Sequence, residues 1–285
     1  AALKNLDTDR PFRIVVYGTP AEETLGSKCD MIKKGCFHDL DVAFMMHGGP
    51  NTCTDVRCLA QRSFHVTFHG KRAHAALAPD KGRSAFDALL AAFQGIEFLR
   101  EHVPDDVRMH YTVAKLPGPA NVVPAEAEGE FAIRSFSRKT LEGVCERFLD
   151  IIKGASLIAG VDYEIKEGTF FFNKIPVLKL NELLMDNARL AGAPQLAPPR
   201  EKTGSTDFGN VMYEIPGSCI RVAFVPEGTP SHSQEFVDAG KTEAAHNCIL
   251  YGAKAIAGAS LDLIMTDGLM EQVKAEFAEN KKKNQ

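Results

Sequence analysis

The order of elements between residues 61 and 172 constrains the fold more than any other feature of this sequence. SFHVTFH (residues 63–69) alternates apolar and polar side chains, which is typical of a strand with one face on a core and one face in water. A helical pattern, two strand-like runs, a second helical pattern and a last strand follow. The order β-α-β-β-α-β predicts a ferredoxin-like, split-βαβ module, with its helices on one face of an antiparallel sheet.

The first helix of this module is expected over residues 84–103, where apolar side chains recur three and four positions apart. Its expected core stripe consists of Leu89, Leu90, Phe93, Ile96 and Leu99. The second helix is expected in TLEGVCERFLDIIKGASLIAG, and the last strand in DYEIKEGTFFF.

The regions on either side of residues 61–172 have a different pattern of apolar residues. FRIVVYG (residues 12–18) and LDVAFMMHGG (residues 40–49) are nearly continuous apolar runs that stop at glycine, which predicts strands buried on both faces with a helix between them. Helices and a further buried strand are expected after Pro176. The sequence therefore predicts a mixed-sheet α/β domain in two parts, residues 1–60 and 173–285, interrupted by an inserted α+β domain over residues 61–172.

Composition excludes several classes of function. With 33 basic against 37 acidic residues, the net charge is −4, and no basic run is interleaved with aromatic residues. We therefore expect neither a nucleic acid nor a membrane as a partner. The sequence contains no unbroken stretch of 18 apolar residues, so we expect no membrane span. Its first residues do not resemble a signal peptide. Seven cysteines without CxxC pairs indicate reduced thiols and a cytoplasmic protein.

The tetrapeptide PAEE follows the first predicted strand and carries two adjacent carboxylates, Glu22 and Glu23. Such a pair repels itself unless a cation or a proton compensates, so one carboxylate can bind a metal while the other takes a proton from water. The alternative is two solvated glutamates in the first turn of a helix. His47 and His232 follow other predicted strands, and Glu, His and His from separate strand ends suit zinc. Taken alone, a histidine at a strand end such as His47 is more often a hydrogen-bonded structural residue, and a loop histidine such as His232 is commonly only solvated.

His74 lies in a loop of the inserted domain, where an exposed turn histidine is the simpler interpretation. The remaining histidines and the cysteines lack the spacing of metal ligands. A Gly-rich phosphate loop and a G-x-S-x-G nucleophile motif are both absent from the sequence, which argues against nucleotide-binding and serine-hydrolase chemistry.

Six segments occur in an order that resembles a known family. They are GTPAEE, MMHGGP, SFHVTFHGKRAHAALAPDKGRSAFDAL, PGPANVVPAEAEGEFAIRS, GSTDFGN and PSHSQEF. Together they resemble the M20 metallopeptidases, and within them the aminoacylase-like amidohydrolases that include the p-aminobenzoyl-glutamate hydrolases. The resemblance implies a two-metal hydrolase of amide bonds, whose phosphorylase/hydrolase-like catalytic domain carries a ferredoxin-like lid that dimerises.

The resemblance also implies roles for individual residues of the catalytic domain. Glu22 matches the general base of the family, and Glu23 matches a metal ligand. His47 and His232 match two further metal ligands. Zinc is the expected metal, at two ions per full-length subunit, with manganese, cobalt and nickel as alternatives.

In the lid, His74 resembles the histidine that reaches the active site of the partner subunit and polarises the scissile carbonyl. Asn121 and Arg134 resemble the residues that hold the carbonyl or carboxylate of the substrate. A guanidinium at position 134 costs desolvation unless an anion meets it, and the simpler partner is a glutamate such as Glu128 or Glu130.

One departure from the family pattern is visible. The early motif His-x-Cys-Gly-His-Asp, which supplies a cysteine and a histidine ligand, does not occur in this sequence. We therefore interpret the chain as an N-terminally incomplete copy that binds one metal weakly or none by itself.

The sequence is compatible with two functions. The first is a homodimeric amidohydrolase that cleaves an N-acyl-amino acid, a dipeptide or an aroyl-amino acid next to a carboxylate. The alternative is a non-catalytic dimeric binding or scaffold protein of the same fold.

Overall fold

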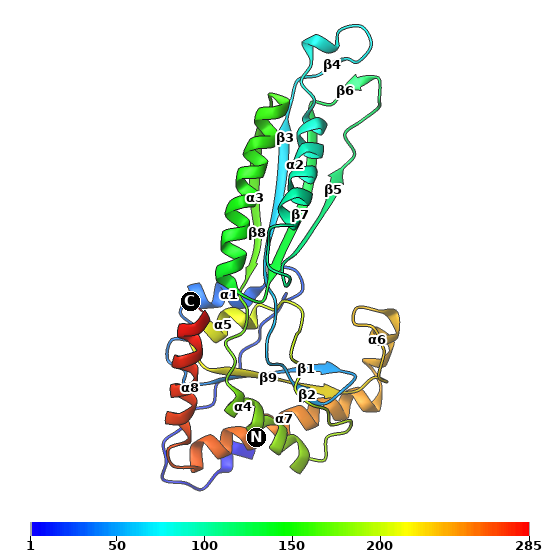
Figure 1. Cartoon of the computed structure of the whole chain (residues 1–285). Coiled ribbons are helices and arrows are strands. Elements are labelled where there is room, and N and C mark those ends of the chain that lie inside the picture. Colours follow the sequence, from blue (N-terminus) through cyan, green and yellow to red (C-terminus); the bar gives the residue numbers. More distant parts are fainter. Residues whose placement is uncertain (1, 285) are drawn as a thin grey trace. The chain divides into compact units, whose positions relative to one another are not determined.

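The computed structural model describes residues 2–284 and consists of two compact units (Figure 1). Unit 1 combines residues 1–58 with residues 174–285, and unit 2 comprises residues 59–173. Unit 2 is thus inserted into the sequence of unit 1.

Unit 2 contains one antiparallel four-stranded sheet in the order β5-β7-β3-β8. Its strands are β3 (Ala60–His69), β5 (Arg108–Lys115), β7 (Glu126–Ser135) and β8 (Asp162–Phe171). Helices α2 (Ala85–Arg100) and α3 (Arg138–Ala159) share a core with one face of this sheet. The chain order and the sheet order are those of the predicted split-βαβ module, so this part of the fold is confirmed.

The core of unit 2 is aromatic at its centre. The ring of Phe148 on α3 lies 4.7 Å from that of Phe64 on β3 and 5.0 Å from that of Phe131 on β7. Alternation along β3 places Phe64 on the buried face, as its pattern predicts. The prediction was wrong for Leu90, whose side chain is 48% exposed, because it lies about 100° around α2 from the buried Leu89.

Three short elements complete unit 2 at one end of the sheet (Figure 1). They are β4 (Ala73–His74), the 3₁₀ helix η2 (Pro79–Lys81) and β6 (Val122–Val123). β4 and β6 pair antiparallel and form a small ribbon.

Unit 1 contains a three-stranded mixed sheet in the order β1-β9-β2. β1 (Ala43–Gly49) and β9 (Gly217–Ala223) are parallel, and β2 (Cys53–Thr54) runs antiparallel to β9. The helical elements of the unit are η1 (Ala2–Asn5), α1 (Ser27–Lys33), α4 (Leu178–Leu190), α5 (Phe208–Glu214), α6 (Gln234–Ala239), α7 (Glu243–Met265) and α8 (Leu269–Asn284). Mixed and antiparallel sheets with covering helices confirm the predicted α/β class.

The strand predicted over residues 12–18 is not formed. This segment belongs to none of the hydrogen-bonded ladders among the described residues, and its apolar side chains include Val16, which is 90% exposed. Arg13 pairs with Asp39, and the Tyr17 hydroxyl donates to the carbonyl of Cys36. Apolarity alone predicted burial, but a strand also needs a neighbour that accepts and donates its backbone hydrogen bonds.

Helix α7 packs closely on the sheet of unit 1. A Cβ atom at Gly252 would lie 2.6 Å from the sulfur of Met46 on β1, so any larger residue here would force the Met46 side chain to shift. Buried Ala255 and Ala259 contribute to the same core as strand β9. By length and by a mean hydropathy of 1.5, α7 could also cross a membrane, although polar residues interrupt its sequence. The absence of a membrane partner therefore stays a prediction.

Candidate active site

The PAEE segment forms a turn immediately before α1. Ala21 has a positive φ of 61°, and its carbonyl accepts hydrogen bonds from the backbone N–H groups of Leu25 (2.9 Å) and Gly26 (3.0 Å). This turn leaves Glu22 half-buried and Glu23 exposed. The two adjacent carboxylates therefore face different environments, which is the condition for giving them different roles.

His47 lies near the end of β1, directly opposite Arg221 of β9 in the parallel register. Its Nδ1 atom is 3.0 Å from Nη1 of Arg221 and 2.5 Å from the carbonyl oxygen of Gly48. The His47 side chain is exposed to solvent, but partial desolvation by the surrounding chain and the positive charge of Arg221 lower its pKa, while the negative charge of Glu22 acts in the opposite direction. The neutral imidazole that this favours is the form that binds metals.

Arg221 is itself held by a buried carboxylate that sequence reasoning missed. Nε of Arg221 donates to Oδ1 of Asp55 at 2.9 Å, and Nζ of Lys174 donates to Oδ2 at 3.0 Å. The side chains of Asp55 and Lys174 are each 1% exposed. Burial acts to raise the pKa of Asp55, but the charges of Lys174 and Arg221 outweigh it and hold this pKa below its ordinary value. The cluster fixes Arg221 beside His47.

Asp207, from the GSTDFGN segment, forms a second buried ion pair. Its carboxylate accepts hydrogen bonds from both the backbone N–H (3.0 Å) and the Nζ atom (2.9 Å) of Lys28. The Asp207 side chain is fully buried. This pair joins the first turn of α1, which follows the PAEE turn, to the residue preceding α5. The ion pair therefore fixes the position at which α1 begins. Apart from the GSTDFGN motif, nothing in the sequence predicts this pair.

His232 lies in an exposed loop before α6, with a positive φ of 63°. Among residues 2–284, no three His, Cys, Asp or Glu side chains come close enough together to hold a metal ion. Glu23, His47 and His232 have the donor chemistry that zinc prefers, but the structure does not bring them together into a coordination site. The arrangement described here therefore does not fit the metal, and we assign it no catalytic step.

In unit 2, His74 and Asn121 are neighbours on the β4–β6 ribbon. The carbonyl of Asn121 accepts a hydrogen bond from the backbone N–H of Ala75 at 3.0 Å. Nδ1 of His74 accepts from the backbone N–H groups of Ala76 and Leu77, both at 3.2 Å. With Nδ1 used as an acceptor, the proton of the neutral ring lies on Nε2. His74 is exposed, so this Nε2–H can donate a hydrogen bond to a ligand.

Arg134 lies on β7 in the four-stranded sheet, near the end of that strand away from the β4–β6 ribbon. Eight residues separate it along β7 from Glu126, a distance of about 26 Å, and the β4–β6 ribbon lies beyond the Glu126 end (Figure 1). Its Nε atom is buried without a hydrogen-bond partner among the described residues, and burial lowers the pKa of its guanidinium. The simpler pairing with Glu128 is not found, because that carboxylate contacts His65 and Lys115 instead.

The inserted unit matches a known domain. Residues 61–157 match the peptidase dimerisation domain found in M20 enzymes. Over 281 residues the chain is 31% identical to the Xaa-Arg dipeptidase of Mus musculus, covering 97% of this chain and 65% of that protein. It is 27% identical to one of the polypeptides of the p-aminobenzoyl-glutamate hydrolase of Escherichia coli, covering 91% of this chain and 66% of that polypeptide. The chain thus spans slightly less than two thirds of the length of these relatives.

Solved structures show the same fold. A dinuclear metal-binding peptidase of the M20 family from Bacillus subtilis superimposes with a TM-score of 0.62 at 18% identity, over 87% of this chain and 64% of that chain. The aminobenzoyl-glutamate utilization protein of Klebsiella pneumoniae gives a TM-score of 0.60 at 21% identity, over 81% and 57%. Residues 61–157 are therefore a peptidase dimerisation domain, and the chain is a relative of the M20 peptidases and amidohydrolases.

Proposed function

We propose that the protein to which this chain belongs is an amidohydrolase that cleaves an N-acyl-amino acid, a dipeptide or an aroyl-amino acid next to a carboxylate. The observation that carries this proposal is the similarity over nearly the whole chain to two hydrolases of such bonds, the Xaa-Arg dipeptidase and the p-aminobenzoyl-glutamate hydrolase. Both names describe an amide bond whose amine side is an amino acid with a free carboxylate.

The environment of Arg134 supports the carboxylate in this proposal. A partly buried guanidinium without an anionic partner is costly, and a carboxylate that accepts two charge-assisted hydrogen bonds would offset that cost.

We assign the role of general base to Glu22, because it is half-buried and its charge acts on His47. In this role Glu22 takes a proton from the attacking water and delivers it to the leaving amine.

We further propose that the activity depends on a divalent metal, with zinc the first expectation. The M20 neighbour of known structure is described as dinuclear, and Glu23, His47 and His232 are the ligands that this chain would contribute. These three side chains do not converge among the described residues, and we propose that the early His-x-Cys-Gly-His-Asp motif, which does not occur in this sequence, would supply further ligands.

The positions of the lid residues favour a homodimer. The β4–β6 ribbon, which carries His74 and Asn121, lies beyond the Glu126 end of β7, and Arg134 lies about 26 Å from Glu126 along that strand, which is farther than a small amide substrate extends. If all three residues contact one substrate, they belong to two copies of unit 2. The match to a peptidase dimerisation domain supports the same arrangement. A cytoplasmic location stays a prediction.

The alternative function, a non-catalytic dimeric binding or scaffold protein, is favoured by one observation. No three-ligand metal group exists among residues 2–284. Metal content by elemental analysis, together with hydrolysis of N-acetyl-amino acids, Arg-terminated dipeptides and p-aminobenzoyl-glutamate, separates the two functions.

The decisive variant is Glu22→Gln, which keeps the size of the side chain and removes the basic oxygen. We expect kcat to fall by about 10²–10⁴-fold, the usual effect of losing a general base, while metal content stays unchanged. Glu279→Gln, which changes an exposed glutamate on α8, is the matched control. Full turnover in Glu22→Gln would move the base to another residue. A wild-type protein that holds no metal and hydrolyses none of these substrates would support the scaffold function.

A further inference from the structure

The turn between α7 and α8 contains the one place in the sequence where glycine directly follows an aspartate or an asparagine, Asp267–Gly268. The Asp267 side chain is 92% exposed, and Gly268 is exposed as well. The carboxyl carbon of an aspartate lies close to the backbone nitrogen of the next residue, and glycine has no Cβ atom to hinder their approach. The turn therefore places an electrophilic carbon beside an accessible nitrogen.

The backbone nitrogen of Gly268 is not restrained by a hydrogen bond. Its N–H group donates to none of the residues that the structure describes, whereas the N–H groups of Thr266 and Leu269 donate to the carbonyls of Asp262 (2.9 Å) and Thr266 (3.4 Å). Gly268 has a φ of 74°, which glycine adopts without strain. Attack by this nitrogen would therefore break no hydrogen bond of the turn.

The carboxylate of Asp267 is restrained by one ion pair. Nη2 of Arg10 donates to its Oδ1 atom at 2.6 Å, and Nη1 of the same guanidinium donates to the carbonyl of Ile264 at 2.9 Å. The Arg10 side chain is 41% exposed, and ion pairs in contact with solvent contribute little. Arg10 therefore slows reorientation of the carboxyl group without preventing it.

We propose that Asp267 isomerises to isoaspartate without an enzyme, and that the pair with Arg10 slows this modification. The protonated carboxyl group reacts first: the nitrogen of Gly268 forms a bond to Cγ of Asp267, a C–O bond breaks, and water leaves, which gives a cyclic succinimide. Water then adds to the main-chain carbonyl carbon of Asp267, and the bond from this carbon to the nitrogen breaks. The chain now continues through Cβ and Cγ. One water leaves and one is added, so the mass of the chain does not change.

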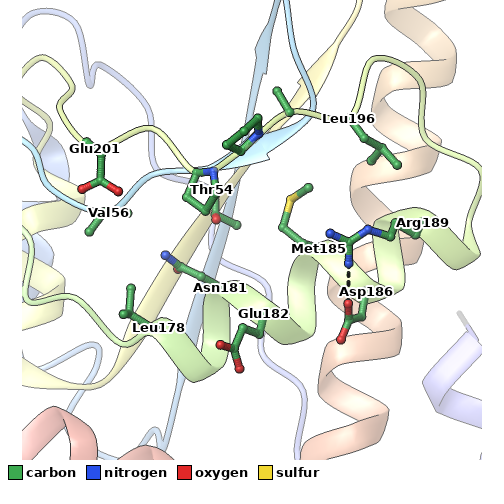
Figure 2. Close-up of a pocket in the computed structure, with 13 residues that line it drawn as sticks. Thr54, Val56, Leu178, Asn181, Glu182, Met185, Asp186, Arg189, Leu196 and Glu201 are labelled. Carbon is green, nitrogen blue, oxygen red and sulfur yellow. Dashed lines mark hydrogen bonds and ion pairs between the residues drawn. The ribbon is translucent and has the colours of Figure 1, made fainter.

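The product lengthens the main chain by one carbon atom beside a helix that is firmly docked. In α8, Val273 is fully buried, and the carboxylate of Glu276 accepts a hydrogen bond from the backbone N–H of Leu178 at 2.7 Å. Leu178 begins α4, which forms one wall of a cavity in unit 1 (Figure 2). The extra atom therefore has to be accommodated within the turn, where the new carboxylate is attached directly to Cα and no longer reaches Arg10 as before.

Ageing of the whole chain in H₂¹⁸O at physiological temperature and neutral pH tests this proposal. Electron-transfer fragmentation of the tryptic peptide that contains Asp262 and Asp267 distinguishes isoaspartate from aspartate at each position. We expect isoaspartate to accumulate with time at Asp267 and to carry one ¹⁸O atom from the second step. Asp262 is the internal control, because leucine follows it and its Oδ2 atom accepts a hydrogen bond from Nδ2 of Asn187 at 2.7 Å.

Variants identify the groups involved. Arg10→Ala should raise the rate by up to about fivefold, the full contribution of an exposed pair. Arg13→Ala, which removes another exposed pair, with Asp39, is the matched control and should leave the rate unchanged. Asp267→Glu keeps the charge but moves the carboxyl carbon too far to close a five-membered ring, so its peptide should stay unmodified. The absence of isoaspartate at Asp267, or equal amounts at Asp262, would overturn the proposal. Equal rates in Arg10→Ala and Arg13→Ala would overturn the restraint assigned to Arg10.

Discussion

The two units of this chain are stabilised in different ways. Unit 2 has one continuous hydrophobic core, in which the aromatic rings around Phe148 join both helices to the sheet. In unit 1, the buried apolar side chains form smaller clusters on either side of a three-stranded sheet, and buried charges such as Asp55 and Asp207 connect its loops. The stability of unit 2 therefore depends mainly on packing between apolar faces. The stability of unit 1, which has long loops, depends also on buried pairs of opposite charges.

The largest effect that we expect tests the core of unit 2. Phe148→Ala should lower the free energy of unfolding of this unit by about 3–5 kcal/mol, because it removes a fully buried ring between two others. Hydrogen exchange followed peptide by peptide would show the loss in β3 and α3. Phe98→Ala on α2, where the ring is 66% exposed, is the control and should cost little. An equal loss of protection in β1 and β9 would show that the units unfold together, and would remove the contrast between them.

The corresponding test in unit 1 breaks its buried ion pair. Asp55→Asn leaves Lys174 without a counter-charge and should cost about 3 kcal/mol, at the low end for a buried pair because the Arg221 side chain is 17% exposed. The loss should appear as faster exchange in β9 and α4. Asp30→Asn, which disrupts an exposed pair with Lys33, is the control. A cost as small as that of the control would mean that packing, and not charge, stabilises unit 1.

The same carboxylate makes unit 1 sensitive to acid. Since the folded state holds the pKa of Asp55 below its ordinary value, its contribution to stability is complete above the unfolded-state pKa of about 3.9 and is lost as the pH falls through the lower folded-state pKa. The urea midpoint of unit 1 should therefore drop on acidification from pH 5 to about pH 2. The drop should be smaller in Asp55→Asn. An unchanged pH dependence in that variant would assign the acid sensitivity to other carboxylates.

The smallest effect should be equal in the two units. Ser84 caps α2 by accepting a hydrogen bond from the N–H of Asp87 at 3.2 Å, and Thr242 caps α7 through the N–H of Ala245 at 3.3 Å. Replacing either residue by alanine should cost about 1 kcal/mol in its own unit, measured by local hydrogen exchange. A cost in unit 2 that clearly exceeded the cost in unit 1 would show that the difference between the units extends to their local structure.

The sequence predicted unit 2 more completely than unit 1, for physical reasons. The alternation in β3 indicates which face of the sheet is buried, and the apolar stripe of α2 indicates which face of the helix packs on it. Because both elements lie within one short stretch of chain, the sequence pattern indicates that these two faces pack against each other. FRIVVYG has the same apolar character, but its structure depends on whether a neighbouring strand pairs with it, which no pattern within residues 12–18 encodes. The error at Leu90 has a local cause, since the buried face of α2 extends from Leu89 towards Ala88 and Ala92, and Leu90 lies on the other side of Leu89.

For the candidate site, the sequence indicates chemically suitable groups at expected strand ends, Glu22, Glu23, His47 and His232, and their roles stay predictions. It does not indicate the contacts that hold these groups in place. The partner of Arg221 could not be predicted, because Asp55 is 166 positions away and an isolated charged residue in a sequence usually indicates solvent exposure. Buried charge pairs of this kind become visible only when the chain is folded.

The ion pair between Asp55 and Lys174 also has a consequence for how the chain is made. Its partners are separated by 119 positions, almost all of them in unit 2. At about 5–20 residues per second, a ribosome needs about 6–24 s to supply Lys174 after it has added Asp55. All the strands of the inserted sheet leave the ribosome before β9 does, so unit 2 can complete its folding before the second part of unit 1 has been synthesised.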